Sequence, residues 1–153
     1  MSHNPYMPPR SDVSVDSTDN IHLYSPKQAA CGALIGGPVG LIYFLRSNFE
    51  NLGNGRSATN TLIYGVILIV ALLIILPLLP DKFPSAPFSV AYIVAARNIA
   101  EKYQISKQGI MDSDRYEFHS NWRVVGYGIL CFLGSVIVIA GPLAALHSLG
   151  FTA

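Results

Sequence analysis

Residues 62–79 constrain the fold most, because they form 18 consecutive residues without a charged side chain. Their sequence is LIYGVILIVALLIILPLL. As a helix, a run of this length covers about 27 Å, close to the thickness of the hydrocarbon core of a bilayer. Pro77 and Pro80 end the run, and the charged pair Asp81 and Lys82 follows. We therefore predict a transmembrane helix over residues 62–79 and an integral membrane protein.

The composition agrees with this class of protein. Only 12% of the 153 residues are charged, about half the share of a soluble domain, and 51% are hydrophobic. The net charge of +1 provides no basic stripe for phosphates, so we expect no nucleic-acid partner. Cys31 and Cys131 each lie inside an apolar run, which favours two buried thiols over a disulfide or metal site. We predict no cofactor and no metal.

A second apolar run, AACGALIGGPVGLIYFL, occupies residues 29–45. Its 17 residues cover about 26 Å as a helix, which predicts another span. Just before it, Ser25 and Gln28 flank Pro26 and Lys27 in the pattern of a helix-capping box. The helix therefore begins at Ser25, and Pro38 predicts a kink at its centre.

The span over 29–45 carries small residues in two columns, one of glycines at every fourth position and one beside it that ends in Gly37. Such a face allows another helix to approach closely, either within the chain or between copies. A second interpretation is a helix broken at Pro38, whose free carbonyls line a transport pathway. The residues that we predict to pack helices together are Gly32, Gly36, Gly37, Pro38, Gly40 and Gly134.

A third apolar run covers residues 124–146, which gives about 35 Å of helix and predicts a tilted span. Trp122 and Arg123 precede it, and both residue types are common at the level of lipid headgroups. Because this span also contains glycines, it is the internal partner that we expect for the span over 29–45.

Residues 86–106 leave two arrangements open. The segment has an amphipathic helical pattern, but only residues 86–96 are uncharged, too few to cross a bilayer. The helix either lies in the membrane interface or re-enters the bilayer with its polar side chains toward the bundle interior. Arg97 has a ready partner in Glu101, and either this pair has a functional role or Arg97 reaches the headgroups.

These segments predict an all-α membrane bundle with three transmembrane helices and one amphipathic or re-entrant helix, with four spans as the alternative. Residues 1–24 are polar and predict a disordered tail, so the helical domain comprises residues 25–153. Three spans place eight basic residues on the N-terminal side and two on the other, which predicts a cytoplasmic N-terminus. A fourth span reverses and weakens this bias. We expect a multi-pass protein of a bacterial inner membrane.

No sequence pattern indicates catalysis, since the chain has no nucleophile motif or phosphate loop, and its charged loop 111–121 matches no metal-binding signature. We predict a non-enzymatic accessory subunit, adaptor or immunity-type protein that acts by helix packing. Its expected partners are membrane lipid and either further copies of itself or another membrane protein. The alternative is a small oligomeric transporter or pore with a pathway near Gly36–Pro38 and Arg97.

Overall fold

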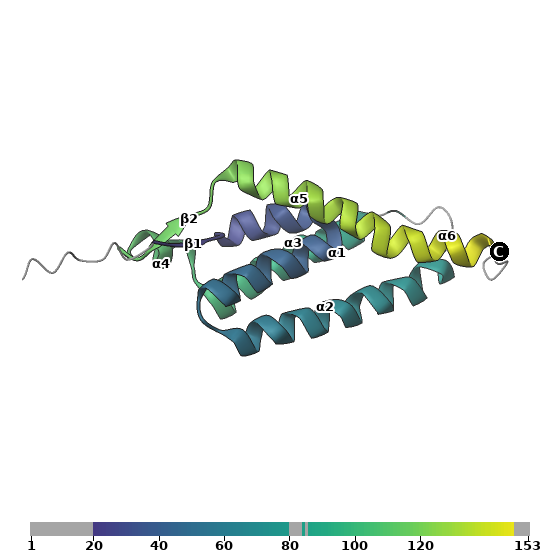
Figure 1. Cartoon of the computed structure of the whole chain (residues 1–153), viewed down its shortest axis with the longest axis horizontal. Coiled ribbons are helices and arrows are strands. Elements are labelled where there is room, and N and C mark those ends of the chain that lie inside the picture. Colours follow the sequence, from purple (N-terminus) through teal and green to yellow (C-terminus); the bar gives the residue numbers. More distant parts are fainter. Residues whose placement is uncertain (1–19, 80–83, 85, 149–153) are drawn as a thin grey trace, which may run out of the picture.

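The computed structural model describes residues 20–79, 84 and 86–148, and the chain is predominantly helical (Figure 1). Three stretches are long and apolar enough to cross a membrane, namely Pro26–Asn51, Gly55–Leu78 and Asn121–Ala145. The predicted helical class and its three apolar helices are thus confirmed. The elements in order are β1 (Ile21–Leu23), α1 (Pro26–Asn51), α2 (Gly55–Ile75), η1 (Leu76–Leu78), α3 (Ala86–Ile99), η2 (Ala100–Gln104), α4 (Lys107–Met111), β2 (Tyr116–Phe118), α5 (Asn121–Ser135), η3 (Val136–Ala140) and α6 (Gly141–Ser148).

Helix α1 is a hairpin of two antiparallel arms rather than one rod. Its helical geometry breaks at Gly37, where φ is 60° and ψ is −147°. The Asn48 side chain bonds to both the backbone N–H and the carbonyl of Tyr24. In an unbroken helix these two residues lie about 36 Å apart. The chain therefore reverses at Gly37, and its first arm (26–36) lies beside its second arm (38–51), as Figure 1 shows.

The sequence explains why the break occurs at this point. The backbone of Gly37 lies in a region of positive φ that is essentially restricted to glycine. Pro38 follows as the first residue of the second arm, where its fixed φ suits a helix start and its missing N–H costs nothing. The predicted kink is therefore a complete reversal, and residues 29–45 do not form the one continuous helix that was expected. The predicted start of the helix is confirmed, since Ser25 and Gln28 form a capping box.

Small residues let the two arms touch. A Cβ placed on Gly32 would overlap the Phe44 ring, and one on Gly40 would lie 2.7 Å from the Gly32 carbonyl oxygen. Both glycines therefore face the opposite arm of the hairpin. Tyr24 and Phe44 close the seam in an edge-to-face contact with ring centroids 4.8 Å apart.

The hairpin is the centre of the bundle, because α2, α3 and α5 all pack against it. Helix α5 continues through η3 into α6, with the hairpin tip against its middle. Gly36 contacts Cys131, and Gly128 contacts Ile35. Each of these contacts joins a small residue to the opposite helix, so α5 is the internal partner expected from the sequence.

Helix α3 and η2 lie along the hairpin on another side. Together they comprise residues 86–104, about 28 Å of helix. Ala96 and Ala100 are fully buried against the hairpin, and Tyr92, Ala95 and Ile99 pack around them. The amphipathic pattern predicted for this segment thus has its apolar face on the hairpin.

Strands β1 and β2 form a short parallel ladder at the base of the hairpin, with Ile21 opposite Tyr116 and Leu23 opposite Phe118. Residues 20–24 had been included in the predicted disordered tail, whereas Leu23 and Tyr24 are almost completely buried. The ordered domain therefore begins before Ser25. The rest of the predicted tail, residues 1–19, lies outside the described residues.

Candidate functional site

The second arm of the hairpin lies between two cavities, which together form the candidate site. The first cavity, here called the apolar cleft, has a volume of about 480 Å³ and opens between α2 and η2, with the second arm as its floor. Helix α2 touches the arm where Gly65 meets Ile42. The cleft is lined by Leu41, Ile42, Leu45, Phe49, Ser57, Asn60, Thr61, Tyr64, Gly65, Leu68, Ile99 and Tyr103.

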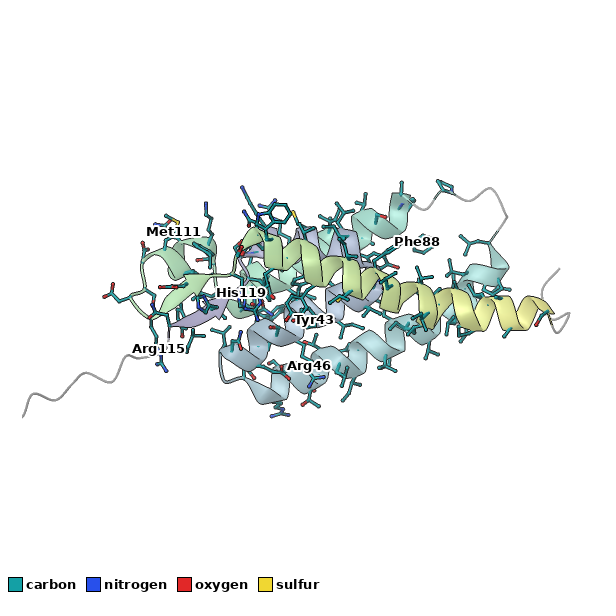
Figure 2. The ribbon with its side chains drawn as sticks, turned by 45° about the horizontal axis from the view of Figure 1, so that its top comes forward. Tyr43, Arg46, Phe88, Met111, Arg115 and His119 are labelled. Atoms are coloured by element: carbon teal, nitrogen blue, oxygen red, sulfur yellow. The ribbon has the colours of Figure 1, made fainter. Side chains whose placement is uncertain are left out.

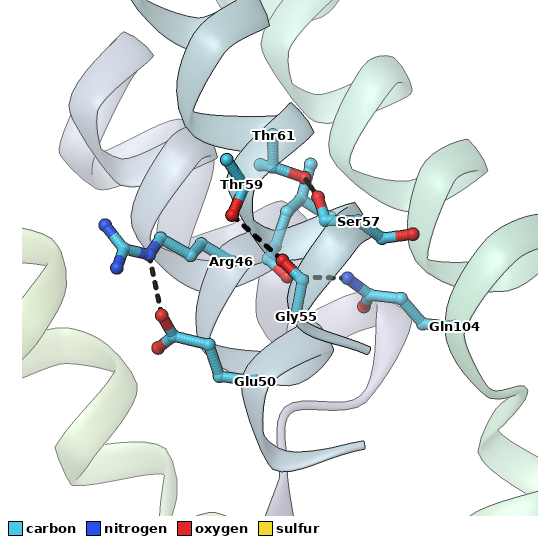
Figure 3. Close-up of polar contacts among 8 residues, drawn as sticks. Arg46, Glu50, Gly55, Ser57, Thr59, Thr61 and Gln104 are labelled. Atoms are coloured by element: carbon cyan, nitrogen blue, oxygen red, sulfur yellow. Dashed lines mark hydrogen bonds and ion pairs between the residues drawn. The ribbon is translucent and has the colours of Figure 1, made fainter. Parts of the chain in front are cut away.

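The polar side chains of the apolar cleft gather toward the base of the hairpin, where α2 begins. The hydroxyl of Thr61 donates to the carbonyl of Ser57 (2.8 Å), and Figure 3 shows this bond on α2. Outside the cleft lining, the Gln104 amide donates to the carbonyl of the lining residue Leu45. Deeper in the cleft the wall is apolar, with Leu41 and Leu68. The cleft is therefore polar at the base of the hairpin and apolar in its deeper part.

The second cavity, here called the interface cavity, lies at the base of the hairpin on the opposite face of the second arm and has a volume of about 440 Å³. Tyr43 and His119, two of its lining residues, are labelled in Figure 2. Polar and aromatic side chains dominate its wall. It is lined by Asn20, Ile21, His22, Tyr24, Tyr43, Ser47, Asn51, His119 and Arg123.

The interface cavity has a positive electrostatic character. Burial, the Arg123 guanidinium and the nearby His22 lower the pKa of His119 from its ordinary value of 6.5 to about 4. Burial raises the pKa of the Tyr24 hydroxyl, while a hydrogen bond with Tyr43 opposes this rise. His119 is consequently neutral at pH 7, and Arg123 carries the fixed positive charge in this cavity.

A buried amide holds the base of the hairpin together. The Asn48 side chain is completely buried, accepts a bond from the Tyr24 N–H and donates to the Tyr24 carbonyl and to Gln104. Gln28 makes a second connection, donating to the carbonyl of His119 and to Asn121 at the start of α5. These bonds join β1, both hairpin arms, η2 and α5 at one end of the bundle.

One hydroxyl completes the hydrogen bonding of the hairpin tip. Ser135 Oγ on α5 donates to the Gly36 carbonyl (2.6 Å) and accepts from the Val39 N–H (3.2 Å). These are groups that the break at Gly37 deprives of helical partners. A backbone group left unpaired in an apolar environment is costly, so Ser135 acts as a cap supplied by another helix.

The structure places the predicted packing residues within the chain's own interior. Gly37 lies beside Ser135, Pro38 is buried at the start of the second arm, and a Cβ placed on Gly134 would lie 3.6 Å from the Val39 side chain. Together with the contacts of Gly32, Gly36 and Gly40, this fills the glycine face with atoms of the same molecule. The glycines therefore explain how the hairpin arms and α5 approach one another within the chain.

The predicted polar candidates lie on the surface. Arg97 pairs with Glu101 at 2.9 Å, and the two side chains are 56% and 44% exposed. They therefore point away from the bundle interior. Trp122 is 84% exposed at the start of α5, beside the interface cavity residue Arg123.

Sequence reasoning missed Asn48, Ser135 and the interface cavity. Asn48 lies beyond the predicted span over 29–45, and Ser135 is one of several small residues in its own predicted span. The signal for Asn48 was its position one turn after Phe44 and Leu45, which continues the apolar face of the second arm. The interface cavity brings together segments about 75 to 100 residues apart, and no local pattern marks it.

Among the described residues, no group of three or more His, Cys, Asp or Glu side chains is placed to hold a metal ion. Comparisons with protein-family models, with curated proteins and with solved structures find no match for this chain. The functional argument therefore depends on the two cavities and on the hairpin between them.

Proposed function

We propose that this chain is a non-enzymatic membrane protein that binds an acyl chain of a phospholipid in its apolar cleft and serves as an accessory subunit or adaptor. The observation that carries the proposal is the cleft itself, an open volume of about 480 Å³ beside a helix whose surface is otherwise exposed and apolar. Sites for apolar ligands are concave, mostly apolar and carry few polar groups, as here.

The chemistry of the cleft suits an amphipathic lipid. Leu41, Ile42 and Leu68 provide a wall for hydrocarbon, while Ser57 and Asn60 lie toward the base of the hairpin. A lipid bound in this way keeps its headgroup at the base, where the charged residues of the chain also gather. An acyl chain leaves other lipid tails, not water, when it enters the cleft, so the binding energy comes from van der Waals packing. We therefore expect selective retention rather than very tight binding.

We further propose that α2, α3 with η2, and α5 with its continuation cross the membrane, while the hairpin enters from one side and returns. Seven basic residues then lie at or near the base end: Lys27, Arg46, Arg56, Lys102, Lys107, Arg115 and Arg123. Among the described residues, the opposite end has no Lys or Arg. The positive-inside rule then supports a cytoplasmic base and N-terminus. A bacterial inner membrane and self-association remain predictions from the sequence.

The transporter alternative has less support. The broken backbone that it requires as an ion or substrate site is bonded to Ser135 at the hairpin tip. Arg97 is exposed and paired with Glu101, away from the tip. Neither the apolar cleft nor the interface cavity is lined by Gly36, Pro38 or Arg97.

Filling the cleft tests the proposal. Thr61→Trp places a bulky ring in the apolar cleft, whereas Ile63→Trp, two residues away on α2, changes an exposed position outside it. Native mass spectrometry of the purified protein in mild detergent counts retained phospholipids. We expect retained lipid in the unchanged protein and in Ile63→Trp, and its loss in Thr61→Trp. Equal retention in all three proteins would refute lipid binding in this cleft.

A further inference from the structure

We propose that the interface cavity is a binding site for a phosphate group, held by Arg123 together with the hydroxyl of Ser47. This site lies on the opposite face of the second arm from the apolar cleft and does not depend on the function proposed above. The juxtaposition that carries the inference is a cation without an acidic partner in a polar cavity rich in hydrogen-bond donors.

Arg123 is the electrostatic centre of the site. Among the described residues, no carboxylate lies within ion-pair distance of its guanidinium, whereas Arg46 and Arg97 each have a glutamate partner. The Arg123 guanidinium instead lies over the ring of Tyr127, 5.6 Å from its centroid. The guanidinium also hydrogen-bonds the Tyr24 hydroxyl. Stacking and this bond fix the plane of the guanidinium, and its remaining N–H groups stay available to an anion.

Its position in α5 strengthens the argument. Arg123 is the third residue of a helix, where the partial positive charge of the helix N-terminus disfavours another cation. An anion bound beside Arg123 interacts favourably with both the guanidinium and this end of the helix. The site therefore has a net preference for negative charge that the chain itself does not satisfy.

The second arm supplies a further donor, the Ser47 hydroxyl, while the Tyr43 hydroxyl is bonded to Tyr24. Tyr43 and Ser47 are one helical turn apart and both line the cavity. Tyr43 stacks on Tyr127 with ring centroids 5.1 Å apart, which places it on the same wall as Arg123. Asn51, the next residue in this row, already donates to the carbonyl of His22.

Glu117, an acidic side chain beside the cavity, already has polar partners. Glu117 accepts a bond from Asn20 and lies 3.8 Å from the His22 ring. It does not line the interface cavity. The cavity therefore presents donors to a ligand, and a phosphate oxygen is the acceptor that best matches them.

Two sources could deliver this phosphate group. The cavity lies at the base of the bundle next to the exposed Trp122, so the headgroup of an anionic lipid can reach it from the membrane. A soluble phosphomonoester can reach it from the aqueous side. Both use the same recognition chemistry, and the experiment separates them.

The test measures thermal unfolding of the full-length protein in detergent against increasing inorganic phosphate, with sodium chloride at matched ionic strength as the reference. We expect saturable stabilisation by phosphate, weakened about tenfold or more in Arg123→Gln because a charge-assisted contact is lost. Arg115→Gln removes an exposed arginine outside the cavity and should bind as the unchanged protein does. Ser47→Ala, which removes a hydroxyl that no recorded hydrogen bond uses, provides a second variant that keeps the test valid if Arg123→Gln fails to fold.

Lipid nanodiscs identify the source. If nanodiscs of phosphatidic acid abolish the phosphate-induced stabilisation and nanodiscs of neutral phosphatidylcholine do not, the ligand is a lipid headgroup. If stabilisation by phosphate persists equally in both, the site takes a soluble phosphate. The absence of a saturable effect of phosphate beyond that of chloride would overturn the proposal. So would stabilisation of both Arg123→Gln and Ser47→Ala by phosphate to the same extent as the unchanged protein.

Discussion

The hairpin and α2 are consecutive stretches of 26 and 21 residues and both are apolar, yet they pack in opposite ways. Just over half of the most apolar window of the hairpin is buried inside the bundle, against 11% for α2. The hairpin carries glycine, alanine and proline where α2 carries isoleucine, leucine and valine. Large apolar side chains suit a surface that faces lipid, whereas small ones allow backbones to approach. Apolar length alone therefore does not define the path of a helix.

The largest expected effect is a steric block between the hairpin and α5. In Gly36→Leu, the new Cβ would lie 2.7 Å from that of Cys131 and 3.2 Å from a backbone oxygen, neither of which can move freely. We expect a loss of at least about 3 kcal/mol in the free energy of unfolding, measured by denaturation in mixed micelles. Gly126→Leu, at a glycine with open space beside it, is the matched control and should cost far less.

The next effect comes from the buried amide. Asn48→Leu leaves the Tyr24 N–H, the Tyr24 carbonyl and Gln104 without their partner, which should cost about 3 kcal/mol. Asn60→Leu makes the same change on α2, where the side chain is exposed and has no recorded hydrogen bond. We expect that variant to unfold within about 0.5 kcal/mol of the unchanged protein. Equal losses in both would contradict the contrast between hairpin and α2.

Removing the cap at the hairpin tip should have a smaller effect. Ser135→Ala leaves the Gly36 carbonyl and the Val39 N–H unpaired, for an expected loss of about 2 kcal/mol in the same assay. Ser57→Ala on α2 removes a hydroxyl with no recorded hydrogen bond and serves as the control. If both serine variants kept full stability, Ser135 would not stabilise the broken backbone.

The smallest effect concerns pH. The folded protein holds the pKa of His119 near 4, below its ordinary value of 6.5, so the unfolded chain binds the proton more readily. The contribution of His119 to the free energy of unfolding should therefore be fully present above about pH 6.5 and should decline as the pH falls toward 4. His119→Gln should flatten this decline in thermal unfolding between pH 7 and 4. An unchanged slope would assign the decline to other groups.

The sequence predicted the helical class and the three apolar helices because these depend on composition and on local patterns. Ser25 and Gln28 likewise defined the start of α1, since a capping box involves neighbouring residues. The glycines and Pro38 correctly marked the segment where backbones meet. What they could not define is the angle of the break, since a kink and a complete reversal satisfy the same local pattern.

The candidate site was not predictable in the same way. The interface cavity requires β1, the second arm and α5 to meet, and the parallel ladder between β1 and β2 joins segments about 95 residues apart. Two three-residue strands have no periodicity that distinguishes them from loops. Arg123 was predicted as an interfacial residue, but its missing acidic partner becomes evident only when the whole arrangement is known.

The most direct test of the hairpin is the side of the membrane on which each of its ends lies. Single cysteines at Asn20, Gly53 and Ser148, introduced after replacement of Cys31 and Cys131 by alanine, can be labelled in sealed vesicles with an impermeant maleimide. A hairpin predicts that Asn20 and Gly53 react from one side and Ser148 from the other. Labelling of Asn20 and Gly53 from opposite sides would mean that residues 26–51 cross the membrane once, and would contradict the account.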